Sequence, residues 1–151
     1  MRKGFTLIEI VIVLAILVVI VAIAIFALNP AEQLAKARNN ERRAHLNSIV
    51  NAIGRNIADN NGAFNCATGP IPTATSTMAD NNPPVGDYNI ASCLIPIYLF
   101  TLPFDPASTT AKFLDVTDYY TGYTIFRDAL TGRITLSSPG AELGETINVT
   151  R

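Results

Sequence analysis

The sequence predicts an α+β fold in which one long N-terminal helix packs on a small antiparallel β-sheet head. Three observations indicate this fold. They are an unbroken apolar run near the start, apolar residues at helical spacing after it, and alternating segments around a Gly-containing turn in the last third. We expect a leader at 1–4, a transmembrane helix at 5–29, an amphipathic stem helix at 30–62 and a globular head at 63–151.

The apolar run is long enough to span a membrane. Every residue from Ile10 to Leu28 is apolar, which gives roughly 28 Å of helix at about 1.5 Å per residue. Glu9 is the single acid at the entrance to this run. A carboxylate at the centre of a membrane helix costs about 2.5–3.5 kcal/mol on insertion scales, and less near an end. An acid in this place therefore indicates a function and a partner for its charge.

A short motif precedes the run. The residues Lys3-Gly4-Phe5-Thr6-Leu7-Ile8-Glu9, followed by the apolar stretch, resemble the leader of type IV pilins and pseudopilins. The resemblance covers about the first 30 residues and implies the pilin fold. It also implies cleavage by a prepilin peptidase between Gly4 and Phe5, N-methylation of Phe5, and pairing of Glu9 with the amine of Phe5 in a neighbouring subunit.

The motif is chemically coherent. Gly4 presents no side chain to a protease. A cut at this point keeps the apolar run in the mature protein, whereas a secretory signal is cut after its apolar region. The new amine at Phe5 neutralises a Glu9 carboxylate inside an apolar bundle, where an unpaired charge is costly. We interpret this pair as a device that sets the axial register between subunits.

The resemblance implies a structural subunit of a type IV pilus-like helical filament. Such a subunit first crosses the inner membrane once and then joins an extracellular or periplasmic filament. Its implied partners are copies of itself, the membrane, the prepilin peptidase, an assembly ATPase and a platform protein.

Other interpretations stay open at this point. One alternative is a pseudopilin of a type II secretion or DNA-uptake piston, and an alternative of another class is a membrane-anchored module whose head binds a ligand as a monomer. The run from Phe5 to Leu28 also fits a plain signal anchor, and Ala22-Ile23-Ala24 fits a signal peptidase site. The positive-inside rule opposes an exported head, because two basic residues precede the run and four follow it by Arg43. We follow the resemblance, which implies that the head is exported.

Pro30 is expected to interrupt the long helix by a kink or a local break, because proline removes a backbone donor and crowds the preceding turn. An apolar stripe follows at spacings of three and four and should face the sheet. Its residues are Leu46, Ile49, Val50, Ile53 and Ile57. Gly62 suits a left-handed cap after the helix. The polar side is expected to carry Arg42, Asn47, Asn51 and Arg55, with His45 in a surface role.

Residues 63–93 are expected to form a loop, since Gly-Pro and Asn-Pro clusters and a Thr/Ser run at 73–77 break regular structure. Cys66 and Cys93 are the only cysteines. An even pair in the head fits a disulfide in an oxidising compartment, with a contribution of about 3.5 kcal/mol in the chain-entropy model. Two free buried thiols are the alternative.

The sheet is expected at about 94–151. Residues 94–106 carry Tyr-Leu, Leu-Pro and Asp-Pro pairs in an order that resembles the segment before the sheet in major pseudopilins. Alternating residues at 123–127 and 133–137 flank a five-residue turn with a glycine, which predicts a hairpin. A short last strand is expected at 146–149.

Charge is unevenly distributed along the chain. The net charge is −1, but residues 30–58 carry five basic and two acidic side chains, whereas residues 59–151 carry four and nine. A basic stem and an acidic head suit the packing of heads on stems in a polymer, and a solvated helix face is the alternative.

No pattern typical of an enzyme is present. The sequence has one histidine, His45, and no Gly-rich phosphate loop or nucleophile elbow. One histidine and two distant cysteines do not make a transition-metal site. Asp115 and Asp118 are too few for calcium, which takes six to eight oxygen ligands. We expect no catalysis, no cofactor, no metal and no specific nucleic acid, because the head lacks a basic patch with interleaved aromatics.

Overall fold

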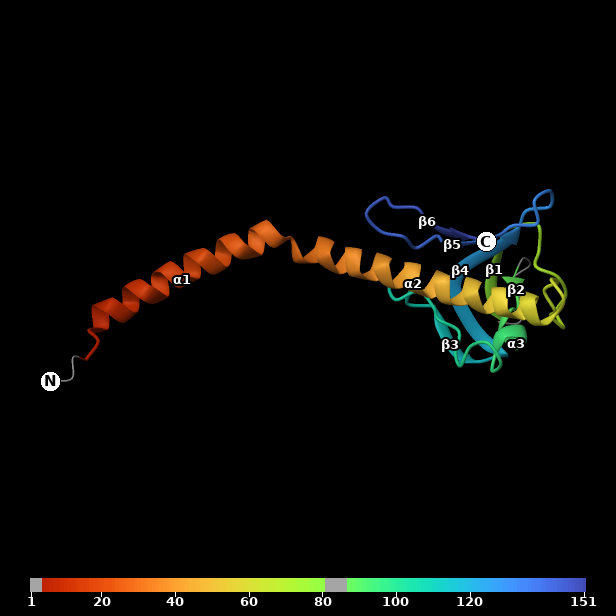
Figure 1. Ribbon diagram of the computed structural model, residues 1–151. Coiled ribbons are helices and arrows are strands. Elements are labelled where there is room, and N and C mark those ends of the chain that lie inside the picture. Colours follow the sequence, from red (N-terminus) through yellow and green to blue (C-terminus); the bar gives the residue numbers. More distant parts are fainter. Residues whose placement is uncertain (1–3, 81–86) are drawn as a thin grey trace. The chain divides into compact units, whose positions relative to one another are not determined.

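A computed structural model describes residues 4–80 and 87–151 of the chain. The chain divides into two compact units, Met1–Ala35 and Lys36–Arg151. The first contains helix α1 (Leu7–Leu28) and the start of helix α2 (Pro30–Asp59), and the second contains the rest of α2 and all the strands (Figure 1). The predicted α+β architecture, with a long N-terminal apolar helix followed by a largely antiparallel sheet, is confirmed.

The two long helices are separated at a single residue. Asn29, directly after α1, has a left-handed backbone with φ 39° and ψ 76°. Pro30 is the first residue of α2, a position where proline is favourable because its missing amide hydrogen has no helical partner there. The carbonyl of Asn29 accepts from the amides of Glu32 and Gln33 and so supports the first turn of α2. The interruption therefore takes the form of a local break.

The apolar stripe of α2 forms one side of the core. Leu46, Ile49 and Ile53 are fully buried, and Ile57 packs against them at the edge. The helix ends at Asp59, within the predicted stem segment 30–62. Gly62 then adopts φ 87° and donates its amide to the carbonyl of Ile57 at 2.9 Å. This is the left-handed cap that the sequence predicted.

One sheet of six strands provides the other side of the core. Its main path runs in the order β2-β1-β4-β5-β6, and β3 also pairs with β4. The strands are β1 (Ser76–Asp80), β2 (Asp87–Tyr88), β3 (Lys112–Asp115), β4 (Asp118–Arg127), β5 (Ile134–Ser138) and β6 (Ile147–Thr150). All neighbours are antiparallel except β1 and β2, which are parallel.

Strand β4 is the centre of the sheet. One edge pairs with β1, and the other pairs with β3 near its start and with β5 near its end. The β4–β5 hairpin lies where the sequence predicted it, with Arg127 opposite Ile134 and a turn in which Gly132 has φ 71°. The last strand, β6, ends one residue later than predicted.

The prediction of a continuous loop at 63–93 is wrong in part. This segment contains β1, β2 and the short helix α3 (Ala91–Leu94). The Thr/Ser run leads into β1, where β-branched residues fit a pleated surface and β4 supplies the hydrogen-bond partners that the local sequence lacks. Met78 and Ala79 of β1 are buried. The predicted Asn-Pro break at 81–84 lies outside the described residues.

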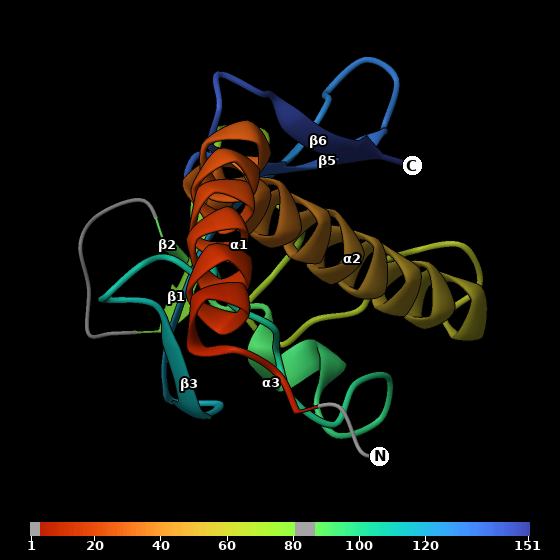
Figure 2. The same ribbon diagram turned by 90° about the vertical axis from the view of Figure 1, so that its left-hand side faces the viewer.

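The core fills the space between the sheet and the part of α2 from Lys36 onward (Figure 2). Tyr119 and Tyr123 of β4 and Met78 of β1 are fully buried in it. Cys66, in the segment after α2, and Cys93 of α3 are joined by a disulfide with a Cα–Cα distance of 5.1 Å. The alternative of two free thiols is therefore wrong.

Candidate functional site

The residues of the predicted processing site lie together at the start of α1. Gly4 and Phe5 precede the helix, and the side chain of Phe5 is 80% exposed. Thr6 is the N-cap, and its hydroxyl accepts the amide of Glu9 at 3.3 Å. The Glu9 carboxylate in turn accepts the amide of Thr6 at 3.5 Å, which completes a capping box. Glu9 thus has an acceptor role within its own chain, next to the residue whose amine processing would expose.

Helix α1 is apolar on every side. Its large apolar side chains are all between 47% and 89% exposed, from Leu7 to Phe26. Among the described residues, Leu7–Phe26 is the one helical stretch that is long and apolar enough to cross a membrane, with a mean hydropathy of 3.4. A soluble helix usually shows an apolar stripe and a polar face. A helix without a polar face needs lipid or other apolar helices around it.

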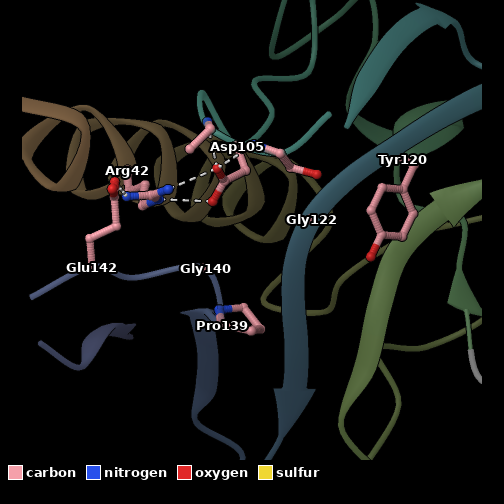
Figure 3. Close-up of a pocket in the computed structure, with 9 residues that line it drawn as sticks. Arg42, Asp105, Tyr120, Gly122, Pro139, Gly140 and Glu142 are labelled. Atoms are coloured by element: carbon pink, nitrogen blue, oxygen red, sulfur yellow. Dashed lines mark hydrogen bonds and ion pairs between the residues drawn. The ribbon is translucent and has the colours of Figure 1, made fainter. Parts of the chain in front are cut away.

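The stem carries a buried arginine. Arg42 is 1% exposed, and its Nε and Nη2 donate to the two carboxylate oxygens of Asp105 at 2.8 and 3.0 Å (Figure 3). Its Nη1 donates to Glu142 at 2.7 Å and to the side chain of Asn39 at 2.9 Å. The prediction that Arg42 lies on the polar side is wrong. It precedes Leu46 by four residues, so it shares the apolar stripe and its charge is neutralised there.

Two further arginines of the stem hold the loop between β5 and β6. Arg38 donates to both oxygens of Glu142, with Nε at 2.7 Å and Nη2 at 2.5 Å. Arg43 pairs with Glu145 at the surface. The hydrogen bonds from Arg38, and then the one from Arg42, lower the pKa of Glu142 to about 2. The opposite charges of stem and head therefore meet within one chain.

Asp105 is held in place by close contacts with β4 and with the loop after β5. Its amide donates to the carbonyl of Thr121 in β4 at 2.8 Å. Gly122 has φ 74°, and a Cβ there would lie 3.1 Å from the Cβ of Asp105. A Cβ at Gly140 would lie 2.7 Å from the carboxylate. Burial alone would raise the pKa of Asp105, but the hydrogen bonds from Arg42 and from nearby backbone amides outweigh it and lower the pKa.

A pocket of about 420 Å³ opens beside this ion-paired cluster, with Tyr120, Pro139 and Gly140 on its walls (Figure 3). The charged groups that line it are Arg42, Asp105 and Glu142, and they are bonded to one another. The cluster therefore fastens the head to the stem and presents no free charge to a ligand. Sequence reasoning missed it, although the helical position of Arg42 was a usable signal.

The predicted surface role of His45 is also wrong. It was expected at the surface, but its side chain is 23% exposed and its Nδ1 lies 2.9 Å from the hydroxyl of Tyr123. Its Nε2 lies 3.7 Å from the Glu41 carboxylate. Burial raises the pKa of Tyr123. His45 thus joins the stem to the centre of the sheet through a side-chain hydrogen bond.

The two aspartates considered for calcium have other partners. Asp115 accepts the amides of Thr117 and Asp118 and the hydroxyl of Thr117 in the turn between β3 and β4. Asp118 pairs with Lys112 at 2.7 Å. Within residues 4–80 and 87–151, no group of three or more His, Cys, Asp or Glu side chains is arranged to hold a metal ion.

The first part of the chain matches a known family model. Residues 1–25 match the prokaryotic N-terminal methylation motif, which is the prepilin motif of type IV pilins and pseudopilins. The match supports a pilin-like or pseudopilin precursor with a membrane-anchored helix. No curated protein and no solved structure matches the chain.

Proposed function

We propose that this protein is a structural subunit of a helical filament of the type IV pilus kind, cut after Gly4 and methylated at Phe5. The observation that carries the proposal is a helix with apolar side chains on every side, placed directly behind a matched methylation motif. The helix remains attached to a folded head, so it needs a permanent apolar environment. A bundle of such helices in a filament core provides one.

Helix α1 is more stable in lipid or in a bundle of apolar helices than in water. Burying a Val, Leu or Ile side chain fully contributes about 1.5–3 kcal/mol relative to water. Helix α1 has more than a dozen such side chains exposed, so water is excluded as its environment. Lipid is about as apolar as a helix bundle, so apolar burial alone does not select a particular arrangement of neighbours. A polar contact at the helix start is needed to select one.

We assign to Glu9 the polar contact that selects one arrangement of neighbouring helices. After cleavage at Gly4, the free amine of Phe5 in one subunit neutralises the carboxylate of Glu9 in another. In an apolar bundle, an arrangement that leaves Glu9 unpaired is disfavoured by the cost of an isolated buried charge. Heterologous contacts of this kind repeat without closing and make a filament.

The partners follow from the same proposal. A prepilin peptidase removes the leader, and an assembly ATPase with a platform protein moves the subunit out of the inner membrane. The head then lies in an extracellular or periplasmic filament, where the disulfide between Cys66 and Cys93 is stable. The chain acts as a building unit and not as an enzyme.

A pseudopilus is the second candidate, because the same motif begins pilins and pseudopilins. A short secretion or DNA-uptake piston would use the same helix and the same Glu9 contact. Neighbouring genes for a secretin and secretion components would favour the piston, and a retraction ATPase gene would favour the pilus. A monomeric binding module on a membrane anchor predicts neither processing at Gly4 nor a polymer.

Mass spectrometry of the native N-terminus tests the proposal directly. The expected product begins with methylated Phe5, and deletion of the prepilin peptidase gene should return the chain to Met1. Filaments should be lost in a Glu9→Leu variant and retained in the control Glu41→Gln, which changes an exposed acid of the stem. An unprocessed chain in wild-type cells would overturn the proposal.

A further inference from the structure

The side chain of Arg151, directly after β6, lies against α2 at Gly54. A Cβ at Gly54 would lie 2.9 Å from Nε of Arg151 and still closer to its Cζ and Nη1. Gly54 is buried within α2, where glycine is less favourable for the helix than alanine. Because Gly54 has no side chain, the guanidinium can approach the helix this closely. The contact places a cation on the flank of α2.

A second arginine borders the same place. Arg55 and Arg151 line a pocket of about 350 Å³, together with Asn51, Gly54 and Ala58. Asn51, Arg55 and Ala58 follow one another at spacings of four and three, so they share one side of α2. Asn51 and both arginines are exposed. This pocket, which we call the Arg55–Arg151 groove, therefore has side-chain donors from the helix and from the end of the sheet on its walls.

Neither arginine has an acidic partner among the described residues. The ion pairs formed within residues 4–80 and 87–151 include neither Arg55 nor Arg151. The next acid along α2, Asp59, is four residues after Arg55 and does not line the groove. Like charges that lie together without a counterion repel each other. The arrangement therefore favours an anion between the two guanidinium groups.

The charge of the groove suits a phosphate better than a carboxylate. In the ion-paired cluster of the stem, two arginines are matched by two carboxylates. A single carboxylate would leave one charge of the groove unmatched, whereas a phosphate monoester carries about −1.5 to −2 at pH 7. Arginine binds phosphate oxygens through two parallel N–H···O bonds. The partial negative charge at the end of α2, about half an elementary charge, opposes an anion but is smaller than either guanidinium charge.

From these features we infer that the Arg55–Arg151 groove binds a phosphate group. The two guanidinium groups and the amide of Asn51 are the donors, and Gly54 gives the Arg151 side chain its place. The inference goes beyond the filament and does not need it, because a single subunit has the complete groove. Two sources supply this chemistry, the free phosphate ion and a phosphate ester carried by another molecule.

NMR of the arginine side chains tests the site in the full-length chain. Protein with isotope-labelled arginine, in micelles of a non-ionic detergent, is titrated with inorganic phosphate at constant ionic strength, and with acetate as the comparison anion. The Nε–H signals of Arg55 and Arg151 should shift and saturate with phosphate, whereas the signal of the ion-paired Arg42 should stay in place. Equal saturation with acetate would overturn the assignment of phosphate, and the absence of saturable shifts would overturn the site.

Substitutions separate a defined site from a diffuse charge effect. Arg55→Gln and Arg151→Gln should each weaken phosphate binding at least about tenfold, because each removes a charged donor. Arg133→Gln is the matched control, since Arg133 is exposed, adjoins Ile134, the backbone partner of Arg151, and does not line the groove. It should leave phosphate binding unchanged. Equal losses in Arg133→Gln and Arg55→Gln would overturn the site.

Gly54→Ala tests the placement of the cation without changing any charge. Its Cβ would displace the Arg151 guanidinium, so phosphate binding should weaken about tenfold. The urea midpoint should not fall, because alanine favours the helix more than glycine does. Phosphate binding as tight as in the wild type would overturn the inference.

Titration with glycerol phosphate distinguishes the two sources of the ligand. The same two arginine signals should respond, because the phosphate group is shared. Tighter binding of the ester would identify a phosphorylated molecule as the ligand, and tighter binding of inorganic phosphate would identify the free ion. None of these measurements involves processing at Gly4 or a polymer, so failure of the groove would leave the proposed function intact.

Discussion

Removing the carboxylate of Asp105 should lower the free energy of unfolding of the head more than the loss of an exposed ion pair does. The side chain is 3% exposed and accepts from Nε and Nη2 of Arg42. It also accepts the amides of Ala107 at 2.8 Å and Ser108 at 3.2 Å. In Asp105→Ala, the buried guanidinium keeps only Glu142 and Asn39 as side-chain partners.

The expected cost follows from the burial of the pair. Removing one partner of a buried ion pair typically costs about 3–5 kcal/mol, because the remaining charge stays desolvated. Ala107 is exposed and Ser108 is half-buried, so water replaces the carboxylate at their amides in part and these two bonds add less to the loss than the ion pair does. In Glu145→Ala the lost partner is Arg43, and these side chains are 35% and 45% exposed. Exposed pairs contribute about 0–1 kcal/mol, so this variant is the matched control.

Urea unfolding of the full-length chain in detergent micelles measures both variants. The sequence has no tryptophan, so tyrosine fluorescence reports on the head, where Tyr119 and Tyr123 are fully buried. Asp105→Ala should lower the midpoint strongly at an unchanged m-value, and Glu145→Ala should barely move it. Equal midpoints for the two variants would refute the assignment of the buried pair as the main ionic contact of the head.

Other measurements test neighbouring features. Acid should destabilise the head as pH falls from about 4 towards 2, because the folded pKa of Glu142, about 2, lies below its unfolded value and its contribution is lost on protonation; in Glu142→Gln this loss in a pH series of urea midpoints should be smaller. Gly122→Ala should lower the free energy of unfolding, measured with urea, by more than about 1 kcal/mol, because φ is 74° and the Cβ of Asp105 lies 3.1 Å from the new Cβ. An unchanged free energy of unfolding would contradict the close contact. Reducing the bond between Cys66 and Cys93 should cost about 3.5 kcal/mol, measured with and without dithiothreitol; identical curves would show that the cross-link does not constrain the unfolded chain.

The sequence predicted the features that depend on local pattern. The apolar run gave α1, because a continuous stretch of this length has few other structures available. The spacing of Leu46, Ile49 and Ile53 gave the buried face of α2. The β4–β5 hairpin was predictable because its turn and both strands lie within one short segment.

The features that could not be predicted from the sequence depend on residues that are distant along the chain. Asp105 follows Arg42 by 63 residues, and no local pattern connects them. Arg42 was assigned to the polar side by its charge, although its helical position places it on the stripe. Strand β1 was taken as loop because its hydrogen bonds come from β4, more than 35 residues later. In both cases the fold supplies what the local sequence lacks.

The candidate site divides in the same way. The roles of Gly4, Phe5 and Glu9 were predicted from the motif alone, and they stay predictions; the family model matches this segment because the motif is a short linear sequence. The ion-paired cluster and the Arg55–Arg151 groove appear only in the folded head. The motif covers only the start of the chain, so it does not predict the surfaces of the folded head.

The capping box at the start of α1 has a consequence for the reversibility of the proposed filament. In a solitary subunit, Glu9 is already engaged with the amide of Thr6. In the proposed filament, joining a neighbour would exchange this hydrogen bond for the contact with the neighbour's amine, and dissociation would restore it. If the proposed filament forms, a subunit that left it would return to the bilayer with its acid hydrogen-bonded to its own backbone.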